Sequence, residues 1–262
     1  KPLVMTIHDI GLAYMDYAFV RGLRRIVDSI PVKMAIDWSD LVIVQNSVTY
    51  DYISKFKPKR IVLIPQGVDA EKFKPKKTKG RYVTFIAARL VKLKGDEVFV
   101  RAVPHVLKEI RDAEFRVIGG GYRREYLMKL AEKVGVLDKI DFTGSIPYHE
   151  VPKYLAEANV VVCPGAPAGL ILLEAAAMRK PIITVSHKWS VESLGKNAFY
   201  IPSGNPRRLA EKIIYALKNP DVSEKMAEAA YKKVISERSW EKVVSEHLKI
   251  YRELLGRCGR EV

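Results

Sequence analysis

Cysteine is scarce in this sequence, with only two residues among 262, Cys163 and Cys258. They lie far apart and lack the spacing of a metal site, which excludes a disulfide framework and a zinc module. Cys163 ends the apolar run Val160–Cys163, a setting typical of a buried, reduced thiol. We therefore expect no bound metal.

Long apolar runs are also missing. No stretch of eighteen apolar residues occurs, and the N-terminus lacks the basic region, apolar core and cleavage site of a signal peptide. These absences predict a cytoplasmic protein. Glutamine occurs only at Gln45 and Gln66 while Lys and Glu abound, and this balance favours a thermophilic source.

Positive charge is abundant, with a formal net charge of +15. Such an excess indicates an anionic partner: a nucleic acid, an anionic membrane surface or a phosphate-bearing substrate. Much of it falls in residues 55–60 and 72–81, where a solvated linker is an equally good interpretation. Because these cations cluster in a linker and match no recognised nucleic-acid-binding module, we expect no nucleic acid. In residues 14–26 aromatic and aliphatic residues alternate with arginines, which fits either membrane docking or an amphipathic helix packed on its own domain.

The sequence after residue 80 alternates short apolar runs with helical patterns. Apolar residues at 3.6-residue spacing predict helices near 98–110, 127–134, 151–158 and 170–179. The expected strands are residues 82–87, 115–118, 140–143, 160–163, 181–185 and 198–201. Strands with helices between them need crossover connections, so the pattern predicts a doubly wound α/β domain with a parallel sheet.

The first seventy residues contain three further strand-like runs, at 3–7, 41–44 and 61–64. Three strands make a small parallel sheet, so residues 1–70 are predicted to be part of an N-terminal domain that is truncated here. The polar, proline-containing stretch 71–80 is interpreted as a linker, 81–238 as the larger domain, and 239–262 as a C-terminal helix returning toward the first domain.

Arg89 and Lys94 lie between the strand at 82–87 and the next helix. Ligands of open parallel sheets bind beyond the carboxyl ends of the strands. Two cations beside the N–H groups of a helix N-terminus would hold a diphosphate there. The alternative is a pair of ordinary surface cations.

Glu174 follows Gly169-Leu170-Ile171-Leu172-Leu173 and lies in an otherwise apolar helix. A carboxylate in such a setting is costly unless a partner satisfies it. A ribose diol would do so through two charge-assisted hydrogen bonds. A structural role at a helix N-terminus, favoured by the helix dipole, is the alternative.

Two weaker signals remain. His8 ends the first strand and could contact a sugar or its phosphate, although a lone histidine is more often structural. Gly119–Gly121 follows a strand, as phosphate-binding glycine loops do, but so do many structural glycines.

The order of these segments resembles the large retaining glycosyltransferase family known as group 1 or family 4, whose GT-B fold has two facing Rossmann-like domains. The matching motifs are the interdomain signature Ile64–Asp69 with Phe73 and Pro75, the pair Arg89-Leu90 and Lys94-Gly95, the loop Val117–Gly121, the base-reading segment Phe142–Gly144, the stretch Gly169–Glu174 followed by Lys180–Ile183, and the helix start Ser239-Trp240.

This resemblance implies transfer of a sugar from a UDP-, GDP- or ADP-sugar to a lipid-linked or saccharide acceptor, with retention of configuration and without a metal or other cofactor. Arg89 and Lys94 would neutralise the leaving diphosphate, Glu174 would hold the ribose, and His8 would approach the sugar. The implied donor-binding residues are Arg89, Lys94, Gly95, Gly120, Phe142, Thr143, Gly144, Gly169, Leu170 and Glu174.

The sequence departs from the family pattern at Ala166, eight positions before Glu174, where the family has its first motif glutamate. The family uses that carboxylate to touch the donor sugar. Ala166 therefore supports an alternative, a nucleotide-binding partner subunit of GT-B fold whose catalysis is impaired.

Overall fold

The computed structural model describes residues 1–8, 30–76, 81–166 and 168–257. The chain forms two compact units: unit 1 comprises Lys1–Gly67 with Trp240–Val262, and unit 2 comprises Val68–Ser239. Among the described helices, none combines the length and the apolar character that crossing a membrane requires.

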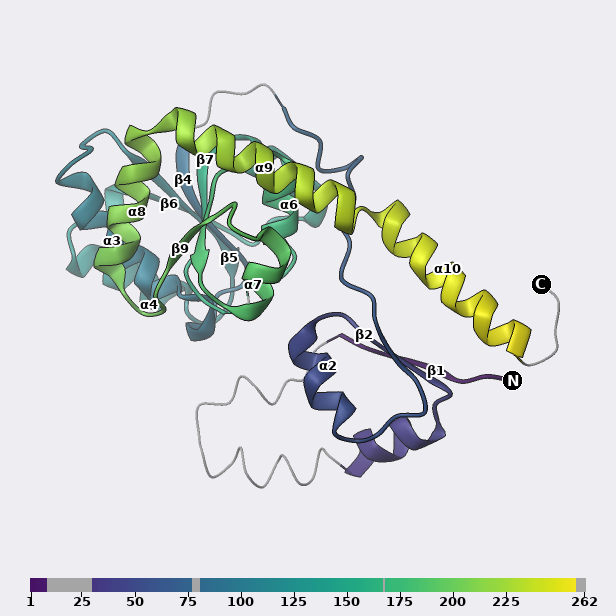
Figure 1. Cartoon of the computed structure of the whole chain (residues 1–262). Helices are drawn as coiled ribbons and strands as arrows, with labels where there is room; N and C mark the ends of the chain where they lie inside the picture. Colours follow the sequence, from purple (N-terminus) through teal and green to yellow (C-terminus); the bar gives the residue numbers. More distant parts are fainter. Residues whose placement is uncertain (9–29, 77–80, 167, 258–262) are drawn as a thin grey trace. The chain divides into compact units, whose positions relative to one another are not determined.

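The helices and strands are labelled in Figure 1. Their bounds are β1 (Val4–Ile7), β2 (Leu41–Val44), α2 (Ser47–Ser54), β3 (Ile61–Leu63), β4 (Tyr82–Arg89), the 3-10 turn η2 (Lys92–Lys94), α3 (Asp96–Leu107), β5 (Glu114–Gly120), α4 (Arg124–Lys133), η3 (Leu137–Lys139), β6 (Ile140–Gly144), η4 (Tyr148–Glu150), α5 (Val151–Ala156), β7 (Ala158–Cys163), α6 (Ile171–Ala177), β8 (Ile182–Val185), α7 (Lys188–Leu194), β9 (Phe199–Ile201), α8 (Pro206–Lys218), α9 (Pro220–Arg238) and α10 (Trp240–Arg257).

Unit 1 contains a parallel sheet in the order β1-β2-β3, so the three strands expected in this region are confirmed. Leu41 and Ile43 of β2 pack in one apolar cluster with Val243 and Leu254 of α10. An ion pair of 2.7 Å between Arg60 and Glu253 also joins this helix to the sheet segment. The segment 14–26, with its two interpretations, lies outside the described residues.

Unit 2 is built on a six-stranded sheet in the order β6-β5-β4-β7-β8-β9. Every neighbouring pair is parallel, which confirms the expected doubly wound α/β architecture. Strand β7 has the burial that this architecture requires: residues Val160 to Cys163 are all buried, because helices cover both faces of the sheet. Phe73, within the stretch interpreted as a linker, is buried against this unit.

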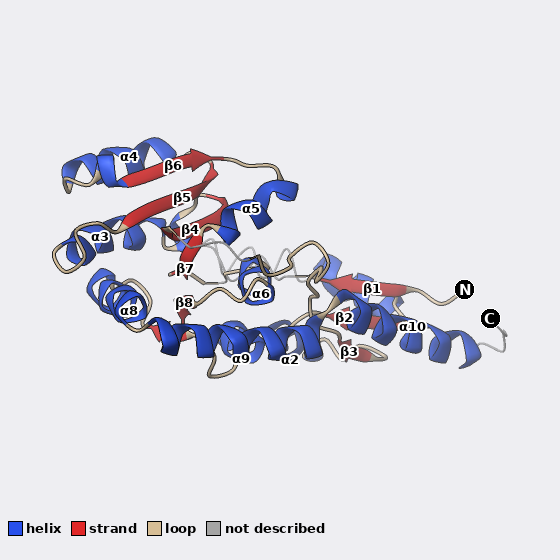
Figure 2. Cartoon of the chain, turned by 90° about the horizontal axis from the view of Figure 1, so that it is seen from above, coloured by secondary structure: helices blue, strands red, loops and turns tan. Residues whose placement is uncertain are grey.

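The two faces of the unit 2 sheet carry separate apolar cores. Alternate residues of β4 divide between them, with Val83 and Phe85 on one face and Ile86 on the other. Helices α3, α4 and α8 cover the first face, while α5, α6, α7 and α9 cover the second (Figure 2).

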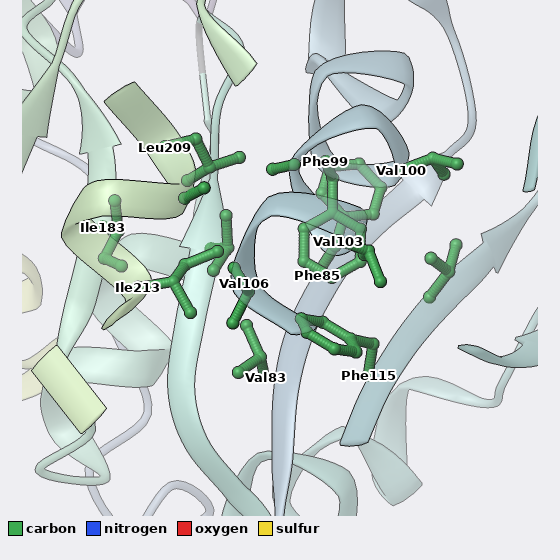
Figure 3. Close-up of a cluster of buried hydrophobic side chains, with 14 of the residues drawn as sticks. Val83, Phe85, Phe99, Val100, Val103, Val106, Phe115, Ile183, Leu209 and Ile213 are labelled. Atoms are coloured by element: carbon green, nitrogen blue, oxygen red, sulfur yellow. The ribbon is translucent and has the colours of Figure 1, made fainter. Parts of the chain in front are cut away.

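The first core is centred on aromatic side chains of α3 and its strands. Figure 3 shows Phe99 of α3 between Phe85 and Phe115, with ring centroids 5.6 Å and 6.1 Å away. Leu209 and Ile213 of α8 complete the layer from the other side. This packing holds α3, and with it the loop that precedes α3, against the end of β4.

Candidate functional site

A cavity of about 420 Å³ opens at the carboxyl ends of the unit 2 strands. The helices that follow β4 and β5 lie on one face of the sheet, and those that follow β7 and β8 lie on the other. The chain therefore leaves β4 and β7 in opposite directions and creates a crevice between them, where ligands of open α/β sheets bind. The lining residues are Ile86, Ala87, Ala88, Lys94, Ile118, Gly119, Ser145, Ile146, Tyr148, Val151, Ala168, Gly169, Leu170, Ile171 and Glu174.

Glycines let the loops around this crevice approach one another closely. A Cβ at Gly95 would lie 2.6 Å from the carbonyl oxygen of Pro164, so the backbones after β4 and β7 touch. Gly119 has φ +140° and a Cβ there would collide with the carbonyl oxygen of Ala87. Gly165 leaves equally little room, because its Cβ would meet the backbone of Lys94. Only glycine meets these steric demands.

Glu174 supplies a buried carboxylate at the wall of the cavity. Its side chain belongs to α6, all of whose residues are buried, and Glu174 itself is only 6% exposed. Burial raises the pKa of the Glu174 carboxyl, while the hydrogen bond from Tyr148 and the charge of Lys72 oppose that rise. The Glu174 carboxylate thus faces a cavity in which few protein groups satisfy its hydrogen-bonding capacity.

Tyr148 provides the hydrogen bond to this carboxylate. Its hydroxyl donates to Glu174 Oε1 over 2.9 Å, and its ring lines the cavity. The Lys72 ammonium lies 3.6 Å from the centroid of the same ring. Burial and the neighbouring Glu174 charge raise the pKa of the Tyr148 hydroxyl, which therefore stays protonated at neutral pH and donates a hydrogen bond.

Lys94 lines the cavity and brings a positive charge to it. Its charge also reaches Cys163 at the end of β7: burial raises the pKa of that thiol to about 12, with Lys94 opposing the rise and Glu174 adding to it. The thiol is accordingly protonated and unreactive. Arg89 ends β4 beside Gly120 of β5 and is exposed; it is outside the residues that line the cavity.

The loop after β5 is tied to the start of α3 by a buried ion pair. Arg123 donates to Asp96 through Nε (2.8 Å) and Nη2 (3.1 Å), and Asp96 is fully buried. Asp96 directly follows Gly95. This ion pair therefore holds the loop after β5, which contains Gly119–Gly121, against the segment Arg89–Gly95. Such a two-point Arg–carboxylate contact is directional as well as strong.

The predicted base-reading residues end β6 and precede the cavity-lining residue Ser145. Arg124 donates to the carbonyl oxygen of Phe142 over 3.2 Å. The Thr143 hydroxyl is buried and has no hydrogen-bond partner among the described residues. Gly144 adopts φ +81°, and open space lies where its Cβ would be.

Two further sequence candidates lie elsewhere. His8 belongs to unit 1, where its Nδ1 is 3.0 Å from Gln45 Oε1, so its approach to a sugar stays a prediction. Ala166 is partly buried and packs against the first core of unit 2. Among the described residues that line the cavity, Glu174 is the only acidic one.

The structure thus brings Lys94, Gly169, Leu170 and Glu174 to one cavity. Gly95 and Gly120 lie one position from lining residues. Sequence reasoning missed Tyr148 and Lys72, because no local pattern places a tyrosine 26 positions upstream on a particular carboxylate. Chemically, the crevice can hold an anion beside Lys94 and a vicinal diol beside Glu174. Among the described residues, no cluster of three or more His, Cys, Asp or Glu could hold a metal ion.

Solved structures with the same architecture define the class of fold. Sucrose-phosphate synthase from Thermosynechococcus elongatus superposes with a TM-score of 0.82 at 22% identity, over 97% of this chain and 68% of that one. HepE from Anabaena, in complex with UDP, gives a TM-score of 0.79 at 19% identity, over 98% of this chain and 72% of that one. At such identities the likeness shows the fold alone, and that fold is the GT-B glycosyltransferase fold.

The family model for glycosyl transferases group 1 matches residues 68–233, and the chain belongs to this family. A relative from Mycobacterium tuberculosis is 27% identical over 263 residues and is named a GDP-mannose-dependent alpha-(1-6)-phosphatidylinositol monomannoside mannosyltransferase. The match spans 91% of this chain and 66% of the relative, so the chain spans just under two thirds of that protein's length.

Replacing Gly119 by alanine should reduce the free energy of unfolding by about 1–3 kcal/mol, the cost of one strongly strained backbone position. The added Cβ meets a backbone oxygen of β4, which cannot rotate away. Urea denaturation would measure the loss. Gly256→Ala is the control, since Gly256 is helical with open space around it and should tolerate alanine. Equal stability of the two variants would contradict this reading of the crevice.

Glu174→Gln should raise the Tm at about pH 8 and leave it nearly unchanged at about pH 4. The folded-state pKa of Glu174 lies above its unfolded value, so the stability that the protonated form contributes is complete below the unfolded pKa. That contribution is lost as the pH rises through the folded pKa. Glutamine keeps an acceptor for Tyr148 and never ionises.

Thermal melts across this pH range would test the effect, with Glu132→Gln on the exposed side of α4 as control. A fall in Tm for Glu174→Gln at the higher pH would show instead that the ionised carboxylate stabilises the free protein.

Proposed function

We propose that this chain contains the donor-binding part of a retaining, metal-independent glycosyltransferase. The observation that carries the proposal is the meeting of Lys94 and buried Glu174 in one cavity at the crevice between β4 and β7. Membership of the group 1 family supports nucleotide sugars as donors. Retention of configuration and independence of a metal follow from the family resemblance.

In the proposed reaction, the bond from the sugar's anomeric carbon to the diphosphate breaks and a bond to an acceptor oxygen forms. The acceptor hydroxyl loses its proton, which passes to the departing diphosphate or to water. Lys94 and Arg89 neutralise the charge that develops on the leaving group. Preorganised charges of this kind are often the largest contribution to catalysis.

The other roles are assigned to the groups that surround the cation. Glu174 accepts hydrogen bonds from the ribose hydroxyls, and backbone groups of Gly95, Gly120, Gly169 and Leu170 face the phosphates. The segment Phe142–Gly144 reads the base. His8 approaches the transferred sugar from unit 1.

For the acceptor we propose a saccharide or a lipid-linked sugar, because the mycobacterial relative is named for action on a phosphatidylinositol mannoside. A formal charge of +15 would help such a protein to reach anionic lipid. We accordingly propose a cytoplasmic enzyme that associates peripherally with the inner membrane face.

Calorimetric titration with UDP, GDP and ADP should show binding of one of the three. Arg89→Ala and Glu174→Ala should each weaken it about tenfold or more, which corresponds to about 1.4 kcal/mol. Glu132→Ala on exposed α4 is the control and should bind like the parent protein. No binding of any of the three nucleotides by the parent would contradict the proposed donor site.

The same binding, combined with failure to transfer sugar from the matching nucleotide sugar to any saccharide or lipid acceptor, would favour the second candidate. That candidate is a nucleotide-binding partner subunit in which Ala166 replaces the family's first glutamate. Recovery of transfer in Ala166→Glu would then identify the missing carboxylate as the cause.

The chain should float with liposomes that contain about 30% anionic lipid and remain unbound with neutral liposomes. Raising the salt concentration should release it, since screening weakens such attraction. Equal flotation on the two lipid mixtures, or none on either, would remove the membrane part of the proposal.

A further inference from the structure

Tyr148 contacts Glu174, the acidic residue among the described residues that line the cavity. The tyrosine begins the 3-10 turn η4, and its side chain is 55% exposed, yet its hydroxyl reaches the buried Glu174 carboxylate. The Tyr148 side chain therefore extends from the surface to the buried Glu174 carboxylate along the wall of the cavity.

The hydrogen bond from Tyr148 answers a local need. Glu174 is surrounded by the apolar residues of α6, and within the described part of the chain no second hydrogen-bond donor reaches its carboxylate. A buried carboxylate without a donor is unfavourable. In the free protein, therefore, the tyrosine hydroxyl supplies the contact that a ligand hydroxyl would otherwise have to supply.

The contacts that hold the Tyr148 ring are less directional than this hydrogen bond. The Lys72 ammonium lies over the ring, and Phe73 packs against it with ring centroids 5.9 Å apart. Asp69 fixes the turn that carries both residues, because its Oδ1 accepts the backbone N–H of Lys72 over 2.9 Å. A small shift of the ring beneath Lys72 preserves these contacts, whereas the same shift of the hydroxyl breaks its hydrogen bond to Glu174.

We propose that Tyr148 is an internal competitor that stands in for the ribose. Its hydroxyl occupies Glu174 in the free protein and leaves when the 2′,3′-diol of a nucleoside diphosphate arrives. This inference rests on the proposed function, because it takes Glu174 as the group that binds the diol.

In this exchange the ligand competes with the tyrosine for Glu174. A ligand with both ribose hydroxyls replaces one hydrogen bond by two, whereas a dideoxynucleotide displaces the tyrosine without replacing its bond. The tyrosine therefore lowers the affinity of every ligand that must displace it, by the free energy of its own hydrogen bond.

A second geometry would assign Tyr148 the opposite effect. If the tyrosine stays in place and orients Glu174 toward the ribose, the diol and the phenol bind the carboxylate together. Removing the hydroxyl then weakens nucleotide binding. In the exchange that we propose, removing it strengthens binding, because no internal bond has to be broken.

The decisive variant is Tyr148→Phe, which keeps the ring and its contacts with Lys72 and Phe73. We expect its affinity for the preferred nucleoside diphosphate to rise about threefold or more, since a hydrogen bond to a charged group no longer competes. Inorganic pyrophosphate has no diol to exchange for the tyrosine hydroxyl, so it should bind the variant and the parent alike. Melting of the free variant should occur at a lower temperature than that of the parent, and saturating nucleotide should narrow the difference.

Tyr215→Phe is a matched control. Tyr215 of α8 is 45% exposed, and its ring lies 5.9 Å from both Phe199 and the Lys212 ammonium. No hydrogen bond of its hydroxyl occurs within the described residues. This variant should bind nucleotides as the parent does.

Unchanged or weakened nucleotide binding in Tyr148→Phe would overturn the exchange. Loss of binding in Glu174→Ala would still support the donor site, so the two ideas can fail separately. Binding by Tyr148→Phe but not by the parent would support both. If neither protein binds UDP, GDP or ADP, both are overturned.

Discussion

The parallel pairing of β4 between β5 and β7 is the constraint on which the rest of unit 2 depends. A parallel sheet must be covered on both faces, and the helices reach those faces by leaving β4 and β7 in opposite directions. The crevice follows from that divergence. Its walls come within van der Waals contact only because Gly95, Gly119 and Gly165 stand where any side chain would collide with backbone.

Within this crevice, stability and ligand binding place opposite demands on Glu174. The protein would be more stable with a neutral side chain on α6, because burial disfavours the charged carboxyl. An ionised carboxylate is nevertheless a strong acceptor for two hydroxyl groups. The buried Asp96 carboxylate, in contrast, accepts two hydrogen bonds from Arg123 and is closed to solvent, so a ligand cannot reach it. Asp96 is therefore a structural carboxylate, whereas Glu174 has one hydrogen-bond donor, Tyr148, among the described residues.

The described contacts also explain how distant segments join in one site. Asp69 shapes the turn that holds Lys72 over Tyr148, and Tyr148 reaches Glu174 from the loop between β6 and α5. Lys72, near the start of unit 2, therefore contacts the side chain that binds the buried Glu174 carboxylate. Ala166, by contrast, is partly buried and packs against the first core of unit 2.

The sequence by itself determined the strands, the parallel sheet and the family. Runs such as Val160–Cys163 are apolar without alternation, and the motifs around Lys94 and Glu174 are local in sequence, so their signals survive without coordinates. Patterns of this kind reflect the burial of each segment against its layer. The N-terminal strands were equally visible as short apolar runs, and the structure places them in one sheet.

Only the tertiary structure decided which of the candidate residues share a cavity and what occupies Glu174 in the free protein. Lys94 lines the cavity and Arg89 does not, although Arg89 ends β4 and Lys94 follows that strand closely, because the turn η2 directs Lys94 back toward β7. The bond from Tyr148 to Glu174 joins the turn η4 to helix α6, and these two elements are separated in sequence by α5 and β7. Such contacts depend on how segments that are distant in sequence pack together, and the local spacing of residues does not encode that packing.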